Sequence, residues 1–322
     1  MRLVLNAGLK LLVSVGLSWY LVLQIDLDLA GLGGVFARTI PWLLGVAVLV
    51  FAASNVLGAL QWHLLLRAQR LAITYRQSLV FYLVGVFFNN VLLGNIGGDA
   101  LRIYDIRRLT GETSGGMAAT FLDRFVGLFT TCSLALAAYP LIADARGPGL
   151  FSGLLVVWLG LLVLLAMGLS RRLGHSLERV SARVLPNRLH RLVSKLRMSI
   201  AVYRHQLPLL GAVLLLSLAV QFMRILVYWT AGLAVGMQAG LIHFVCFQPV
   251  AAVVAALPIS IGGLGVRENL LVELFSRVEV DGHLVLAMSL WGYLAGIVAS
   301  LVGGIAFVLR RVGPADHARE EG

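Results

Sequence analysis

The sequence predicts an all-α fold, a polytopic transmembrane helical bundle. Of its 322 residues, 59% are hydrophobic and only 13% are charged, and the mean hydropathy is +0.91. Soluble domains carry about 25% charged residues. Segments 125–143, 150–170 and 282–309 contain no charge, and a helix needs about 20 apolar residues to cross a bilayer core. Because these runs lack the alternation of barrel strands, helices are the predicted spanning elements.

The positive charge of the chain fits a membrane protein better than a nucleic-acid-binding one. The net charge is +11, but the basic residues adjoin the hydrophobic segments, as they do at the cytoplasmic face of membrane proteins. No nucleic acid is therefore predicted as a partner. Cys132 and Cys246 lie in apolar runs and are predicted to be small buried hydrophobic residues. The first apolar run is interpreted as a retained span, because no small-residue cleavage site follows it.

Eight segments are candidate spans, and the placement of Lys and Arg decides which of them cross. If 78–98 crossed fully, the basic stretch 171–206 would lie outside the cell, against the positive-inside rule. We therefore predict about six crossings plus two re-entrant hairpins, with both termini cytoplasmic in the cytoplasmic membrane. The eight segments are 7–25, 41–66, 78–98, 116–140, 150–170, 207–236, 240–266 and 283–309.

A single transmembrane domain is predicted, followed by a short polar cytoplasmic tail. Between its two halves, apolar residues recur at helical spacing on both sides of Pro186-Asn187. This pattern predicts two basic amphipathic helices on the anionic cytoplasmic leaflet, which either anchor the topology or recruit lipid. The predicted parts are the domain 1–311, a first half 1–140 with a re-entrant 78–101, the linker 171–206, a second half 207–311 with a re-entrant 240–267, and the tail 312–322.

A repeated motif ends both re-entrant segments. Residues 95–102 (NIGGDALR) align without a gap on residues 260–267 (SIGGLGVR), and the shared pattern is polar-Ile-Gly-Gly-x-small-aliphatic-Arg. In the predicted topology three crossings separate the copies, so they face opposite sides of the membrane. This is typical of an inverted-topology repeat, in which interrupted helices meet near the midplane around a binding site.

The chemistry of the motif is that of an anion site. A Gly-Gly pair permits a sharp turn, and a helix that begins there directs its N–H groups and positive dipole end at the turn. Arg102 and Arg267, one helical turn further on, are expected to offer a planar fork to a phosphate. The alternative is that the glycines only permit close helix packing and the arginines reach the membrane interface.

Two adjacent charges open an otherwise apolar span. Asp123 and Arg124 project about 100° apart on a helix, so they neutralise each other poorly. Each needs another partner, and Arg102 and Asp99 are the candidates.

Arg224 lies deeper, in the middle of 207–236. Charges within spans are costly and usually face a cavity or a partner. Arg224 is therefore interpreted either as a substrate-binding residue or as half of a structural ion pair, for which Glu268 is a candidate.

The chain lacks the motifs of several enzyme classes. It has no G-x-x-x-x-G-K-[ST] loop for nucleotide hydrolysis and no H-E-x-x-H zinc pair, and no Ser or Cys nucleophile has a nearby base. No catalytic activity, metal or cofactor is predicted.

Three segments resemble a known family. The sequences NNVLLGNIGGDALRIYDIRRLTG, TFLDRFVGL and ALPISIGGLGVREN are similar to those of the lysylphosphatidylglycerol synthase transmembrane family, also called flippase-like, over about 10–310. The resemblance implies a lipid-translocating membrane domain. In bifunctional members that domain moves aminoacylated phosphatidylglycerol outward after a cytosolic domain makes it. Other members are associated with hopanoid or polyprenyl-linked lipid pathways.

The sequence departs from the bifunctional members. Only eleven residues follow Arg311, so we expect no aminoacyl-transferase domain and no synthesis of lysyl-lipid. The first motif has Gly94-Asn95 where a proline often stands, whereas the second keeps Pro258, and this difference is expected to alter the first turn.

The leading hypothesis is a flippase-like transporter of a phospholipid or lipid-phosphate. Membrane lipids are the predicted partners, with an anionic headgroup favoured. The two motif arginines would bind the phosphate alternately, and Asp99, Asp123 and Glu268 would balance them or accept protons. The alternatives are a non-transporting accessory subunit that binds a lipid-modifying enzyme, or an intramembrane lipid-phosphate enzyme. The candidate substrate-binding residues are Gly97, Gly98, Asp99, Arg102, Asp123, Arg124, Arg224, Gly262, Gly263, Arg267 and Glu268.

Overall fold

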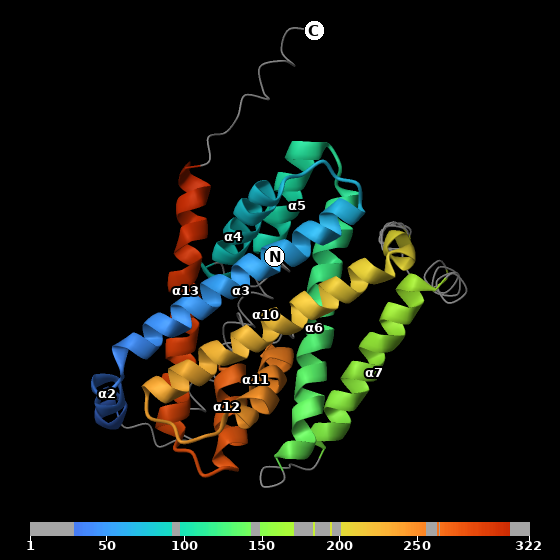
Figure 1. Cartoon of the computed structure of the whole chain (residues 1–322). Helices are drawn as coiled ribbons and strands as arrows, with labels where there is room; N and C mark the ends of the chain where they lie inside the picture. Colours follow the sequence, from blue (N-terminus) through green and yellow to red (C-terminus); the bar gives the residue numbers. More distant parts are fainter. Residues whose placement is uncertain are drawn as a thin grey trace.

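The computed structural model confirms the all-α, polytopic membrane fold. It describes residues 29–91, 97–142, 149–170, 183, 194, 201–255, 263 and 265–309, and the regular structure in these ranges is entirely helical (Figure 1). The predictions for the first span, most of the basic linker, the tail, the turn residues 92–96 and Gly262 lie outside the described residues.

Four long apolar helices form the frame of the described part of the chain. Each helical segment contains 28 residues, which is enough by length and composition to cross a membrane. A proline in the first turn starts two of them, α3 and α10, where its missing N–H costs nothing. The four are α3 (Pro41–Ala68), α6 (Ser114–Ala138, continued by η1, Tyr139–Leu141), α10 (Leu207–Ala234) and α13 (Gly282–Leu309).

Shorter helices flank this frame. The apolar helix α7 (Leu150–Leu169) packs along α6 and leaves Val156 and Val163 exposed, as a lipid-facing helix would. Helix α2 (Leu29–Ala37) contacts α13, and the 3-10 turn η3 (Val202–His205) leads into α10.

Two helical hairpins occupy the predicted re-entrant positions. Helix α4 (Tyr75–Val91) packs against α5 (Gly97–Thr110), and α11 (Leu241–Ala255) packs against α12 (Val266–Ser276). Figure 1 shows the first hairpin in the upper half of the molecule and the second in the lower half. Both returning helices extend beyond the predicted ends at residues 101 and 267. That neither hairpin crosses the bilayer stays a prediction.

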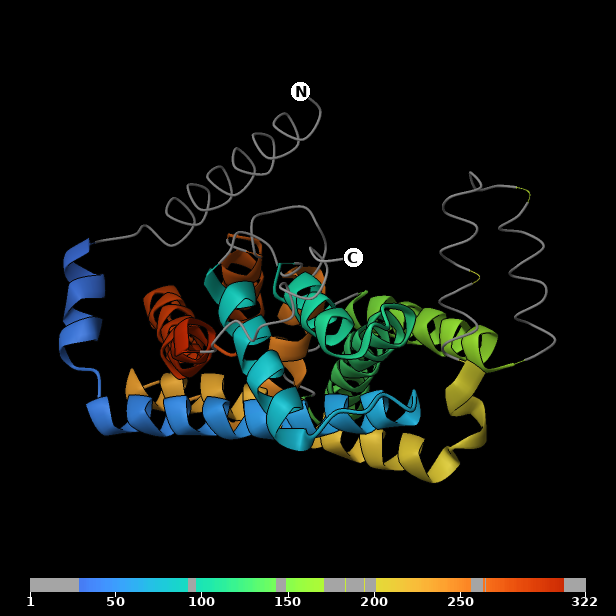
Figure 2. The same cartoon turned by 90° about the horizontal axis from the view of Figure 1, so that it is seen from above.

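Helices α3 and α10 lie antiparallel along each other. The Ile40 N–H at the start of α3 donates to the Ala234 carbonyl at the end of α10 (2.9 Å), and the Tyr203 hydroxyl before α10 donates to the Leu65 carbonyl near the end of α3 (2.9 Å). Figure 2 shows the two helices side by side in one layer. Counterparts in the two halves therefore run in opposite directions.

Each hairpin packs against the other half of the protein. Helix α4 lies on α13 and α11 lies on α6, while α3 also contacts α13 and α10 also contacts α6. If α3–α4–α5–α6 is matched to α10–α11–α12–α13, every one of these packed pairs has its counterpart. The exchange of hairpins between halves is the arrangement expected of an inverted-topology repeat.

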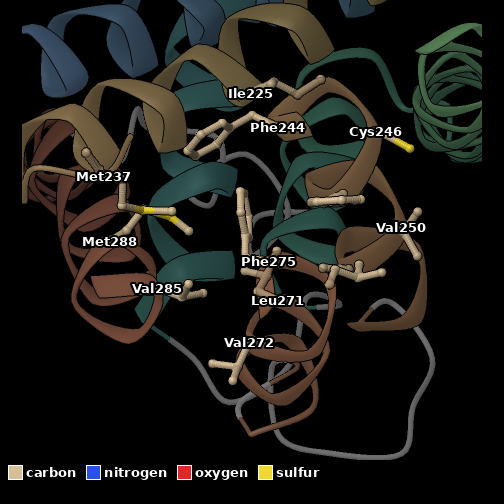
Figure 3. Packing of buried hydrophobic residues seen from close by; sticks show 14 of the residues in the cluster. Ile225, Met237, Phe244, Cys246, Val250, Leu271, Val272, Phe275, Val285 and Met288 are labelled. Carbon is tan, nitrogen blue, oxygen red and sulfur yellow. The ribbon is translucent and has the colours of Figure 1, made fainter. Parts of the chain in front are cut away.

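The largest apolar core lies around the second hairpin (Figure 3). The Phe275 ring of α12 lies 4.9 Å from Phe244 and 5.1 Å from Phe247 of α11, measured between centroids. Cys246 and Cys132 are both 0% exposed and unpaired with each other, which confirms that they are small buried hydrophobic residues. The core fixes α11 and α12 relative to α6, α10 and α13.

Candidate functional site

The first motif brings α5 tightly against α4. Gly97 and Gly98 both lie in the first turn of α5. A Cβ on Gly98 would collide with the Gly85 carbonyl, and the Gly98 N–H donates to the Asn89 side-chain oxygen at 2.9 Å. The prediction that a helix begins at this Gly-Gly pair is confirmed, while the sharp turn before it stays a prediction, because residues 92–96 lie outside the described residues. The glycines of the pair permit close approach between the two helices.

The second motif forms a turn. Gly263 and Gly265 have φ values of +80° and +79°, in the left-handed region that favours glycine. Helix α12 begins only at Val266, three residues after Gly263. The helix therefore begins at a different position of the eight-residue motif in each copy.

Arg102 is a buried arginine on α5, 2% exposed. Its Nη2 donates to Asp99 Oδ1 at 2.7 Å, and its Nη1 donates to Asp123 Oδ2 at 3.4 Å. The guanidinium lies 4.8 Å from the Tyr82 ring centroid and 5.1 Å from that of Trp62, distances at which aromatic faces attract cations. The predicted pairing of Arg102 with Asp123 is confirmed, while its role toward a substrate stays a prediction.

Arg124 extends the same network to the surface. Its Nε and Nη2 each lie 2.8 Å from an oxygen of Asp99, which is the other predicted pairing. Gln61 Nε2 donates to Asp123 Oδ1 at 2.9 Å. The charges thus form a chain of Arg124, Asp99, Arg102 and Asp123 with no net formal charge. Arg124 is 45% exposed and Asp99 is 19% exposed, so the chain is open at one end.

Arg267 is the counterpart of Arg102 in the second hairpin. Its Nη2 and Nε lie 2.6 and 3.0 Å from Glu268 Oε1, and its Nη1 donates to the Tyr228 hydroxyl at 3.0 Å. The guanidinium lies 5.8 Å from the Tyr228 ring centroid and 5.5 Å from that of Tyr293. This arginine is 13% exposed. It combines an ion pair with two aromatic neighbours, as Arg102 does.

Glu268 is held by two further groups on nearby elements. Its Oε2 accepts the Gly265 N–H at 2.9 Å, in the manner of a capping box at the start of α12, and its Oε1 accepts the Ser289 hydroxyl at 3.1 Å. Pairing of Glu268 with Arg224 was one interpretation of the sequence, and it is wrong. Arg267 is adjacent in sequence and satisfies the carboxylate locally.

Equivalent positions surround the two motif arginines. Trp62 and Tyr228 are each the twenty-second residue of a 28-residue helix, α3 or α10, and each ring lies by its arginine. A Cβ on Gly263 would lie 2.6 Å from the Ala255 Cβ. Ala255 is the fifteenth residue of α11, and Asn89, which contacts Gly98, is the fifteenth of α4. The two copies of the sequence motif thus place their arginines and glycines among neighbours at equivalent positions.

Helix α13 connects the two sites. The Tyr293 hydroxyl donates to the Asn90 carbonyl near the end of α4 at 3.1 Å, and the Asn90 side chain donates to the Gly296 carbonyl at 3.2 Å. Tyr293 is also an aromatic neighbour of Arg267. The end of the first hairpin is therefore linked to the arginine of the second through one side chain.

Arg224 joins neither motif arginine. It is half-buried on α10, and among the described residues it makes no hydrogen bond or ion pair, with its Nε buried and unpartnered. It lies within electrostatic range of Asp123. The structure thus brings Asp99, Arg102, Asp123 and Arg124 into one cluster, Arg267 and Glu268 into another, and leaves Arg224 beside the first.

Sequence reasoning missed the residues that surround the arginines. Gln61 carries a signal that was available, because it is a polar side chain in an apolar span. The aromatic residues carry none, since rings in apolar helices are ordinary core residues in sequence. The missed residues are Gln61, Trp62, Tyr82, Tyr228, Ser289 and Tyr293.

Comparison with known proteins places this geometry in a family of membrane proteins. Residues 8–312 match the family described as the lysylphosphatidylglycerol synthase TM region. A UPF0104 membrane protein of Methanothermobacter thermautotrophicus is 23% identical over 310 residues, covering 87% of each chain. Another, from Pyrococcus horikoshii, is 22% identical over 292 residues, covering 83% of this chain and 86% of the relative. No solved structure matches.

The match covers both hairpins and all four long helices. The chain belongs to the lysylphosphatidylglycerol synthase transmembrane-region family, as an integral membrane protein.

Proposed function

We propose that the protein is a flippase-like transporter that moves a phospholipid or lipid-phosphate across the cytoplasmic membrane. The observation that carries the proposal is a pair of arginines, the buried Arg102 and the largely buried Arg267, at equivalent positions in two hairpins packed on opposite halves. Matched motifs in two halves that run in opposite directions are typical of inverted-repeat transporters, in which the substrate site forms between the repeats. In this proposal both termini are cytoplasmic.

The carboxylates beside the two arginines are suited to a site that binds and releases an anionic lipid. A buried arginine without a counter-ion is strongly destabilising, and Asp99 and Glu268 supply that counter-ion when no lipid is bound. A phosphate accepts the same planar guanidinium fork as a carboxylate. A lipid phosphate therefore exchanges with the carboxylate, and the arginine is neutralised before and after.

Transport is tested with purified protein in vesicles that contain tail-labelled phosphatidylglycerol. Reduction of the label in the outer leaflet reports how fast lipid from the inner leaflet appears there. We expect the protein to accelerate translocation, and Arg102→Gln and Arg267→Gln each to slow it about tenfold or more, the effect of losing a charge-assisted hydrogen bond.

Arg38→Gln is the matched control, because Arg38 lies exposed at the end of the α2 region. It should retain the full rate. A wild-type protein no faster than protein-free vesicles would refute the transport proposal. Full rates in both hairpin variants, once they are shown to be monodisperse, would refute only the assignment of the two arginines.

A further inference from the structure

A polar seam runs between α6 and α10 inside the apolar frame. The hydroxyls of Thr130 on α6 and Ser217 on α10 lie 2.8 Å apart, and both residues are buried. About one turn away on each helix, Gln221 Nε2 lies 2.9 Å from where a Cβ on Gly127 would be. The missing side chain at Gly127 thus leaves room for the Gln221 amide. Ser, Thr and Gln side chains commonly hydrogen-bond across helix interfaces in membranes, whereas ionisable groups within a span are rare and mark substrate or ion pathways.

The seam continues to two charged residues, one on each helix, that form no ion pair with each other. Asp123 is one turn before Gly127 on α6, and Arg224 is one turn after Gln221 on α10. Residues three and four apart share one helix face, so the three pairs follow one line along the interface. Asp123 also belongs to the cluster around Arg102. The seam therefore leads from the first hairpin site toward the middle of α10.

Arg224 is the uncompensated cation on this line. Arg102, Arg124 and Arg267 each form an ion pair shorter than 3.0 Å, whereas Arg224 forms none with any described residue, and its buried Nε has no partner. The nearby Asp123 is already occupied by Arg102 and Gln61. A cation in a span without a counter-ion is costly, and an anionic ligand removes that cost.

We propose that Arg224 and Gln221 form a binding site for a phosphate group within the span, one that a lipid-phosphate headgroup occupies on its way between the two hairpins. The guanidinium offers a planar fork to the phosphate oxygens, and the amide adds a neutral donor one turn away. The claim that the phosphate group belongs to a lipid rests on the proposed transport function. The anion site itself rests on the seam and the unpaired cation.

The test is binding by the full-length protein in detergent, where translocation has no meaning. Dihexanoyl phosphatidic acid and inorganic phosphate are titrated separately by calorimetry, with dihexanoylglycerol as the uncharged control. We expect Arg224→Leu to weaken binding of dihexanoyl phosphatidic acid about ten- to a hundredfold, the worth of a charge-assisted hydrogen bond. Gln221→Leu should weaken it less, because a neutral donor is lost. Met223→Leu, next to the site, should bind as the wild type does.

Thermal unfolding of the ligand-free variants separates a ligand site from a structural one. Arg224→Leu should melt no lower than the wild type, because no partner loses its ion pair. A decrease as large as that of Arg102→Leu, or unchanged binding of phosphatidic acid, would overturn the site. Inorganic phosphate bound as tightly as phosphatidic acid would support the anion site and assign it to free phosphate. Phosphatidic acid binding that depends on Arg224, in a protein that fails to translocate lipid, would refute transport and leave the site standing.

Discussion

The two hairpin sites hold equivalent arginines in different ways. Arg102 is neutralised by Asp99 on its own helix and by Asp123 on α6, whereas Arg267 is neutralised by Glu268, the next residue along the chain. The first site thus depends on tertiary packing, and the second is satisfied mainly at the start of one helix. The two repeats share the backbone position and the aromatic neighbours of the arginine, but they differ in the counter-ion.

The sites also differ in access. The outer members of the first site, Arg124 and Asp99, are 45% and 19% exposed. In the second site, Arg267 and Glu268 are 13% and 5% exposed. The outer charges of the first site are thus more accessible than those of the second, although Arg102 itself, at 2% exposed, is more buried than Arg267.

The largest effect on stability is expected from a substitution that disrupts the packing on which the first site depends. Gly98→Ala places a Cβ against the Gly85 carbonyl, a backbone atom that cannot rotate away, and should lower the free energy of unfolding by about 3 kcal/mol or more. Chemical unfolding in mixed micelles measures it. Gly45→Ala, with no atom within 4 Å of the new Cβ on α3, is the control and should stabilise by up to about 1 kcal/mol. Wild-type stability of Gly98→Ala would contradict the close packing of α4 and α5.

The next effect compares the two arginines directly. Arg102→Leu leaves Asp123 buried with only an amide partner, and should destabilise by about 3–5 kcal/mol. Arg267→Leu leaves Glu268 with the Gly265 N–H and the Ser289 hydroxyl, so about 1–3 kcal/mol is expected. The same unfolding measurement ranks the two variants. Equal losses would show that the counter-ions of the two sites are equivalent after all.

The smallest effect concerns the open end of the first site. A double-mutant cycle on Asp99 and Arg124, with Asn and Gln as replacements, should give a coupling free energy of about 0.5–1 kcal/mol, the range of exposed ion pairs, because Arg124 is half exposed. The coupling should decrease from low salt to about 0.5 M salt. The same cycle on Arg267 and Glu268 should give a larger coupling with little dependence on salt. A salt-independent coupling at Asp99–Arg124 would mean that this end of the site is closed.

Much of the fold could be predicted from the sequence because the bilayer restricts what a chain can do. Uncharged runs of spanning length predict helices, and the repeated octapeptide indicates the two hairpins before any contact is known. The partners of Asp123 and Arg124 were also predictable, since a charge in a span needs a counter-ion and few were in reach. For Glu268 the sequence left two partners open, a motif arginine and Arg224, and only the start of α12 selects the adjacent Arg267.

By itself, the sequence determined that this is a helical membrane protein with two matched Gly-Gly-x-x-x-Arg segments. Hydropathy and charge act residue by residue, so they can be read along the chain. Only the tertiary structure decided how α4 lies on α13 and α11 on α6, which rings surround each arginine, and that Arg224 finds no counter-ion among the described residues. Those outcomes depend on which residues of sequence-distant helices come into contact, and local sequence patterns do not contain that information.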